Sequence, residues 1–179
     1  MAETDLGAAA RRALFMDPDA VLYAILDGAS VPRLRDSLDE HGPEYFCLYR
    51  GELEADLADA APYLVRLEPE SPFTAWVFAE GWGRHWGVFA YAEADLITMR
   101  KHFRRFLMVA LPDDRRVYFR YYDPRVLAVY LPTCNAEEAA TIFGPVAQYA
   151  MEGATPGTLL RFAPDPEGAK LQETELAAG

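Results

Sequence analysis

The sequence lacks the long apolar runs and the closely spaced cysteines that mark several classes of protein. No apolar run approaches the roughly 20 residues that a helix needs to cross a membrane. Residues 1–5 are acidic and do not show the basic, then apolar, order of a signal peptide. Cys47 and Cys134 lie far apart in sequence, so we expect free, mostly buried thiols. These absences favour a cytoplasmic location.

Residue types that carry catalysis or bind metals are also few and scattered. The histidines, His41, His85 and His102, include no pair at the i, i+4 spacing of a helical metal site. None of the three serines lies in the context of a nucleophile elbow. We therefore predict no metal, no cofactor and no catalytic group. A Cys–His dyad that forms only in space stays open, because sequence does not show spatial neighbours.

The charge is acidic overall but unevenly distributed. A net charge of −11 argues against nucleic acid or an anionic membrane surface as the main partner. Residues 100–125 hold eight basic and three acidic residues, a local charge of +5 that leaves −16 for the rest of the chain. This asymmetry suggests a basic face for an acidic or polar partner. The alternative is that these arginines pair with the chain's own surplus of carboxylates.

The pattern of apolar residues predicts a single compact α/β domain of mixed, α+β-like class. We expect a central mixed sheet of about five to seven strands with helices packed on it. The strands are expected at 21–26, 44–49, 63–67, 86–91, 107–111 and 116–121, with a further edge strand at 158–162. Residues 1–20 would form an N-terminal helical segment, 21–163 the compact domain itself, and 164–179 a flexible acidic tail.

Asp27 is the residue that most resembles a catalytic group. It follows the apolar run 21–26, and open α/β sheets usually bind ligands just beyond the carboxyl ends of their strands. A phosphatase-like hydrolase would need a second aspartate two residues later, where Ala29 stands instead. We expect Asp27 and Gly28 to serve as turn or cap residues. A small hydrolase using Asp27 at the sheet edge is the alternative.

An aromatic turn occupies residues 81–87, with the sequence G-W-G-R-H-W-G. Its glycine spacing does not match a dinucleotide-binding loop, and its indole rings would fill the space that a pyrophosphate needs. The turn could pack on the core, or it could offer Trp82 and Trp86 to a partner, since tryptophan is enriched at binding hot spots. A small-molecule sensor with an aromatic pocket near these rings is a third possibility.

The stretch 119–127, F-R-Y-Y-D-P-R-V-L, predicts a strand that breaks at Asp123-Pro124 and restarts as a helix. In a structural interpretation, Asp123 caps the helix that Pro124 opens, and an arginine holds its carboxylate with two hydrogen bonds. In a functional interpretation, the exposed groups of this stretch recognise a partner. The partner-binding residues would then be Arg120, Tyr122 and Arg125, supported by Arg104 and Arg105 on the helix 94–106.

An ordered set of motifs places the chain near a known family. The motifs are Y-A-I-L-D-G at 23–28, A-P-Y-L-V at 61–65, G-W-G at 81–83, H-F-R-R-F-L at 102–107 and F-R-Y-Y-D-P-R-V-L at 119–127. With Y-L-P at 130–132 and F-G-P-V at 143–146, the set resembles the domain-of-unknown-function family numbered 4123. Members of that family are effector chaperones or adaptors of the bacterial type VI secretion system.

The resemblance implies an adaptor and not an enzyme. Such an adaptor binds a cognate effector toxin in the cytoplasm and helps to load it onto the VgrG spike protein. The implied partners are these two proteins, with no nucleic acid and no membrane. The chain is short beside family members that carry an additional C-terminal helical region, so the compact domain is expected to make the contacts alone. Trp82 and Trp86 join the arginines as expected partner-binding residues, whereas Asp27, Gly28, Asp123 and Pro124 are expected to be structural.

Overall fold

The most apolar runs of the sequence lie side by side at the centre of one sheet. In the computed structural model, which describes residues 5–177, β1 (Leu22–Asp27) is buried along its whole length. It pairs antiparallel with β3 (Pro62–Leu67) on one side and with β4 (Gly87–Tyr91) on the other. A strand covered on both faces needs apolar residues at nearly every position, which explains the continuous run at 21–26.

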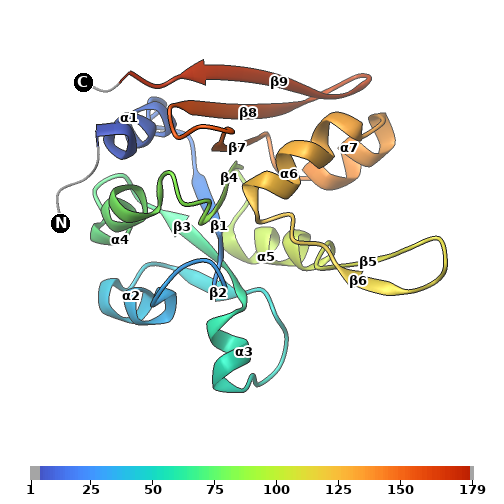
Figure 1. The fold of residues 1–179 in the computed structure, drawn as a ribbon, viewed down its shortest axis with the longest axis horizontal. Coiled ribbons are helices and arrows are strands. Elements are labelled where there is room, and N and C mark those ends of the chain that lie inside the picture. The colour runs from blue at the N-terminus through green and yellow to red at the C-terminus, as the bar shows by residue number, and fades with distance from the viewer. Residues whose placement is uncertain (1–4, 178–179) are drawn as a thin grey trace.

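Seven strands complete this sheet in the order β2-β3-β1-β4-β7-β8-β9 (Figure 1). The outer strands are β2 (Tyr45–Cys47), β7 (Gln148–Glu152), β8 (Thr158–Asp165) and β9 (Gly168–Glu175). The predicted α/β class and strand number are confirmed, but every pairing is antiparallel, so the sheet is not mixed. The physical reason is that β3 inserts between β1 and β2, which run in the same direction but are not neighbours.

The predicted strands at 107–111 and 116–121 do form, but they do not join the main sheet. β5 (Met108–Ala110) and β6 (Arg116–Tyr118) pair only with each other. Their hairpin extends away from the body of the molecule (Figure 1). The ring of Tyr118 packs with its centroid 5.8 Å from that of Tyr49, at a tilted angle, which ties the hairpin to the segment after β2.

The carboxyl-terminal part of the chain differs most from expectation. The predicted flexible tail at 164–179 is wrong as far as the structure describes it, because β9 pairs with β8 at eight successive positions. β9 is polar and largely exposed. It is held mainly by its backbone ladder, with Ala169 packed on the core at its start, so its sequence carries little hydrophobic signal. No strand is predicted at β7, although it lies within the sheet, between β4 and β8.

Helices cover both faces of the sheet and create two cores. α1 (Asp5–Leu14), α2 (Leu34–His41) and α4 (Pro72–Trp76), which continues as a π-helix over Val77–Gly81, cover one face. α5 (Leu96–Arg104), α6 (Pro124–Tyr130) and α7 (Ala136–Phe143) cover the other. A short α3 (Ala55–Asp59) precedes β3, and a 3-10 turn (Leu131–Thr133) follows α6.

The side chains of β1 alternate between these two cores, as the pleat of a strand requires. Tyr23 and Ile25 enter one core, whereas Leu22, Ala24 and Leu26 enter the other. The predicted N-terminal helical segment corresponds to α1, and residues 1–4 lie outside the described part. Cys47 and Cys134 are free thiols. Within residues 5–177, no helix has the length and apolar character needed to cross a membrane.

The pairing of β9 predicts a specific pattern of amide hydrogen exchange. On an antiparallel edge strand, alternate N–H groups point to the neighbouring strand and the others point to solvent. We therefore expect about every second amide of 168–175 to exchange much more slowly than in an unstructured peptide. Exchange followed by NMR checks this. Uniformly fast exchange across 168–175 would show that the segment is a flexible tail.

Candidate functional site

Three buried carboxylates gather where β1 and β7 end and β4 begins. Asp27 is 1% exposed, Asp123 is 4% exposed and Glu152 is 5% exposed. The backbone N–H of Asp27 donates to the carbonyl of Trp86 at 2.9 Å, which joins the end of β1 to the start of β4. Burying a carboxylate costs free energy unless hydrogen bonds or a cation compensate, so the partners of each one define the site.

Asp27 holds the turn that follows β1. Its carboxylate accepts hydrogen bonds from the N–H of Ala29 at 3.1 Å and from the hydroxyl of Ser30 at 2.9 Å. It also forms an ion pair with Arg120, whose pKa is raised by this hydrogen bond. The turn role matches the sequence prediction, whereas the partnership with Arg120, 93 residues away, was not foreseen.

Position 28 must be glycine because the backbone of residues 59–61 passes close to it. A Cβ atom at this position would lie 2.4 Å from the carbonyl oxygens of both Asp59 and Ala61. The N–H of Gly28 donates to the carbonyl of Ala61 at 3.0 Å. No side chain fits between these backbones, so the glycine lets β1 and the start of β3 meet at this end of the sheet.

Asp123 combines a helix cap with an arginine clamp. Its Oδ1 accepts from the N–H of Arg125 at 2.9 Å and from Nε of Arg125 at 3.0 Å, while Oδ2 accepts from a terminal nitrogen of Arg125 at 2.8 Å. Pro124 occupies the first turn of α6. Burial raises the pKa of Asp123, but the hydrogen bonds from Arg125 outweigh it and lower the pKa below its ordinary value. The carboxylate is thus held ionised at the start of the helix.

The two arginines of this corner remain accessible on their outer sides. The side chains of Arg120 and Arg125 are 45% and 62% exposed, respectively. We call the set Asp27, Arg120, Asp123 and Arg125 the Arg–Asp corner. Its carboxylates are buried and its guanidinium groups lie half in solvent. A guanidinium has five N–H donors in a fixed plane, so each can hold its internal carboxylate and still present donors outward.

Three of the expected partner-binding side chains lie in the interior. Trp82 is 7% exposed and its Nε1–H donates to the carbonyl of Pro156 at 2.7 Å. Trp86 is 3% exposed and packs 4.9 Å from the ring of Trp76. Tyr122 is also 3% exposed. The structure therefore does not support direct contact between these rings and a partner, and it favours the packing interpretation of the aromatic turn.

The basic residues of the segment 100–125 serve two different purposes. Arg104 donates to the carbonyls of Cys47, Leu48 and Tyr49 at 2.9–3.1 Å, and so anchors the chain after β2. The guanidinium of Arg100 lies 4.1 Å above the ring of Phe46. Arg105, by contrast, is exposed at the end of α5. Part of this basic charge is therefore structural and part faces solvent.

Glu152 is the member of the site that sequence reasoning missed. Its two carboxylate oxygens accept from the backbone N–H groups of Gly83 at 2.9 Å and His85 at 3.0 Å. Nδ1 of His85 lies 3.4 Å from the same carboxylate. Burial raises the pKa of Glu152 to about 7, against the opposing effect of these hydrogen bonds. The only sequence signal was a glutamate between the apolar residues 149–151 and Gly153.

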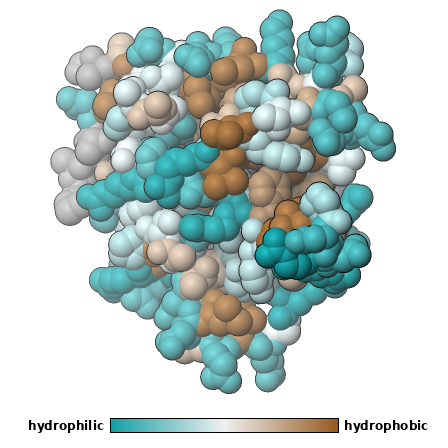
Figure 2. Space-filling view, turned by 45° about the vertical axis from the view of Figure 1, so that its right-hand side comes forward, coloured by the Kyte–Doolittle hydropathy of each residue, from teal (hydrophilic) through white to brown (hydrophobic). Residues whose placement is uncertain are grey.

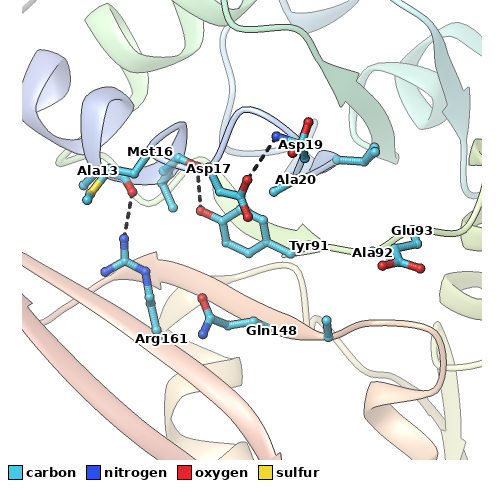
Figure 3. A pocket seen from close by; sticks show the side chains of 13 residues that line it. Ala13, Met16, Asp17, Asp19, Ala20, Tyr91, Ala92, Glu93, Gln148 and Arg161 are labelled. Carbon is cyan, nitrogen blue, oxygen red and sulfur yellow. Dashed lines mark hydrogen bonds between the residues drawn. The ribbon is translucent and has the colours of Figure 1, made fainter.

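A separate pocket of about 550 Å³ lies at the opposite end of β1, between the loop after α1 and the strands β4, β7 and β8 (Figure 3). Arg161 spans it and donates to the carbonyl of Ala13 at 2.9 Å. The hydroxyl of Tyr91 donates to the carbonyl of Leu14 at 2.7 Å. These polar groups fasten α1 to the sheet. Within residues 5–177, no group of three or more His, Cys, Asp or Glu side chains is arranged to hold a metal ion.

Comparison with known proteins gives one match. A family model described as a domain of unknown function (DUF4123) matches residues 22–141. The matched segment runs from β1 into α7 and contains the whole Arg–Asp corner, whereas β7, β8, β9 and Glu152 lie beyond it. No curated protein and no solved structure matches the chain.

The two roles of Asp123 predict a measurable loss of stability on its removal. Asp123→Ala removes the cap of α6 and leaves the guanidinium of Arg125 without its carboxylate partner. We therefore expect the free energy of unfolding to fall by about 1–2 kcal/mol. Urea denaturation measures this change. Asp113→Ala is a matched control, because Asp113 binds Arg115 at the same spacing but is 52% exposed and caps no helix. If Asp113→Ala lowers the free energy of unfolding by as much as Asp123→Ala, the structural role of Asp123 is refuted.

The burial of Glu152 predicts a pH dependence of stability. Its pKa in the folded protein, about 7, lies above the ordinary 4.5, so the folded state keeps a proton that the unfolded state loses. The contribution of Glu152 to stability should therefore decrease as pH rises from about 4.5 to 7, by on the order of 3 kcal/mol, and stay low above that range. A carboxyl carbon NMR titration should place the midpoint near 7. A midpoint near 4.5 would contradict the prediction.

Proposed function

This chain belongs to the family described as a domain of unknown function (DUF4123), and we propose that it is an adaptor of type VI secretion. It would bind a cognate effector toxin in the bacterial cytoplasm and help to load it onto the VgrG spike protein. The observation that carries this proposal is the family match over residues 22–141, which contains the motif at 119–127. The link from that family to effector loading rests on the resemblance described above.

The Arg–Asp corner supports the binding role that the proposal requires. Arg120 and Arg125 are oriented by buried carboxylates, so little conformational freedom remains to be lost when their outer N–H groups meet a partner. Planar guanidinium groups held in this way suit the carboxylates and backbone carbonyls of another protein. The structural and functional interpretations of 119–127 are therefore compatible, because opposite sides of the same arginines serve each of them.

A second group of side chains on the hairpin and on α5 suits protein binding. Met108 and Tyr118 are 45% and 61% exposed on the hairpin β5–β6. Arg116 on β6 and Arg105 after α5 are exposed as well. Aromatic residues, methionine and arginine are enriched in protein interfaces. We call Arg105, Met108, Arg116 and Tyr118 the hairpin surface and propose that it receives an acidic segment of the effector or of the spike.

The hydrolase alternative gains no support from the geometry around Asp27. Its carboxylate is 1% exposed and is engaged by Ala29, Ser30 and Arg120. A carboxylate nucleophile must reach the atom that it attacks, and this one faces the turn that it holds. The adaptor is therefore the proposal that the site supports best.

Co-expression with the proteins encoded by adjacent genes tests the adaptor directly. We expect at least one neighbour to co-purify with the chain in a stable complex, and to depend on it for solubility or export. If no neighbour co-purifies and none depends on the chain, the proposal fails.

Charge reversal on the hairpin surface tests which side chains make the contact. We expect Arg105→Glu combined with Arg116→Glu to weaken the complex by about tenfold or more, because an acidic segment would then meet like charge. The melting temperature should change little, since both side chains are exposed. Arg12→Glu combined with Lys170→Glu, at exposed positions on α1 and β9, is the control with the same change of net charge. Equal weakening by the control would indicate a general effect of net charge and not this surface.

A further inference from the structure

Glu152 lines a cavity that lies beside the Arg–Asp corner. The cavity has a volume of about 480 Å³ and lies between α6, the aromatic turn and the strands β7, β8 and β9. Its apolar wall comes from α6 and β8, and its polar lining residues are His85, Arg125, Glu152, Thr155, Thr158 and Glu173. The apolar residues of the wall are Pro124, Ala128, Val129 and Leu160.

The charges around this cavity are not balanced within the described chain. Of the three buried carboxylates, Asp27 pairs with Arg120 and Asp123 with Arg125. The ion-pair contact of Glu152 is with His85 Nδ1 alone, at 3.4 Å, and that nitrogen is buried without a hydrogen bond. Arg125 also borders the cavity, but its guanidinium is held by Asp123. Glu173 adds a further negative charge.

A buried carboxylate that receives only two backbone hydrogen bonds is stabilised by an approaching cation. A metal ion does not suit the position, because hard cations need several oxygen ligands and no group of three or more His, Cys, Asp or Glu side chains among residues 5–177 is arranged to hold one. A cation on an aliphatic stem suits it better, since α6 and β8 contribute four apolar residues to the same lining as Glu152. Lysine and arginine have this character, because their methylene groups pack on apolar surface while the head group reaches polar atoms.

We propose that this cavity receives a lysine or arginine side chain from a partner protein. The stem lies against Ala128, Val129 and Leu160, and the cationic head group meets the carboxylate of Glu152. The occupant is thus a basic residue, in contrast to the acidic segment proposed for the hairpin surface. This inference does not depend on the type VI assignment, because it rests only on the shape and charge of the cavity.

The cavity is lined by residues inside the family match and by residues outside it. α6 lies within residues 22–141, whereas Glu152 and Leu160 follow in β7 and β8. The proposed contact therefore uses strands that the family model does not cover. It gives these strands a role in binding in addition to their role in completing the sheet.

A small cation and its neutral counterpart provide the test. n-Butylguanidinium has the stem and head group of arginine, and n-butylurea has nearly the same shape without the charge. We expect the cation, at pH 8, to produce saturable shifts in the amide signals of Gly83, His85 and Ala128. The urea should produce none at the same millimolar concentration. Equal shifts with both compounds, or no saturable shift with the cation, would overturn the proposal.

Two variants then assign the binding to the cavity. Glu152→Gln removes the charge, and Ala128→Leu fills the space while leaving Glu152 in place. Both should weaken binding of the guanidinium by about tenfold or more. Ala140→Leu makes the same change at an exposed position on α7 and should leave binding unchanged. If Glu152→Gln disturbs the fold, Ala128→Leu decides the outcome, and unchanged binding in that variant contradicts the proposal. Because the probe is a small molecule, this result is separate from the co-purification test of the adaptor.

Discussion

The ion pair between Asp27 and Arg120 is the interaction on which the site depends. Asp27 ends the central strand of the sheet, and Arg120 stands between the projecting hairpin and α6. The pair fixes the segment 119–123 against the end of β1, and Asp123 can then cap α6 in place. Removing one partner of a buried pair leaves an uncompensated charge, which costs about 3–5 kcal/mol in other proteins. Half-exposure of Arg120 reduces that cost here, because water can reach the guanidinium.

The antiparallel order of the sheet explains why so many polar groups meet at one end. β1 runs towards this end and β4 runs away from it, so the last residue of β1 faces the first residues of β4. β7 runs antiparallel to β4 and brings Glu152 to the same place. Carboxylates at the ends of two strands and at a helix start thus converge although they lie far apart in the sequence. On the face seen in Figure 2, hydrophobic side chains occur in several small groups surrounded by hydrophilic ones.

How much of the structure could be predicted depended on how far apart in the sequence the interacting residues lie. The apolar run of β1 and the Asp123-Pro124 break carry local signals, and both elements form where they were expected. The pairing of Asp27 with Arg120 spans 93 residues and has no local signal. β9 is mostly polar and exposed and joins the sheet through its backbone ladder with β8, so periodicity could not distinguish it from a tail. For Trp82 and Trp86 the pattern allowed both packing and exposure, and burial in the three-dimensional structure decides between them.

The two edges of the sheet have a consequence for how the chain behaves at high concentration. Unpaired strand edges offer rows of free N–H and C=O groups to any other extended chain. One edge, β2, is only three residues long. The other, β9, is long but carries Lys170, Glu173 and Glu175 as exposed charges. Both are features by which natural sheets resist edge-to-edge association. The fold can thus expose a binding surface on its hairpin and helices while its sheet remains a poor template for aggregation.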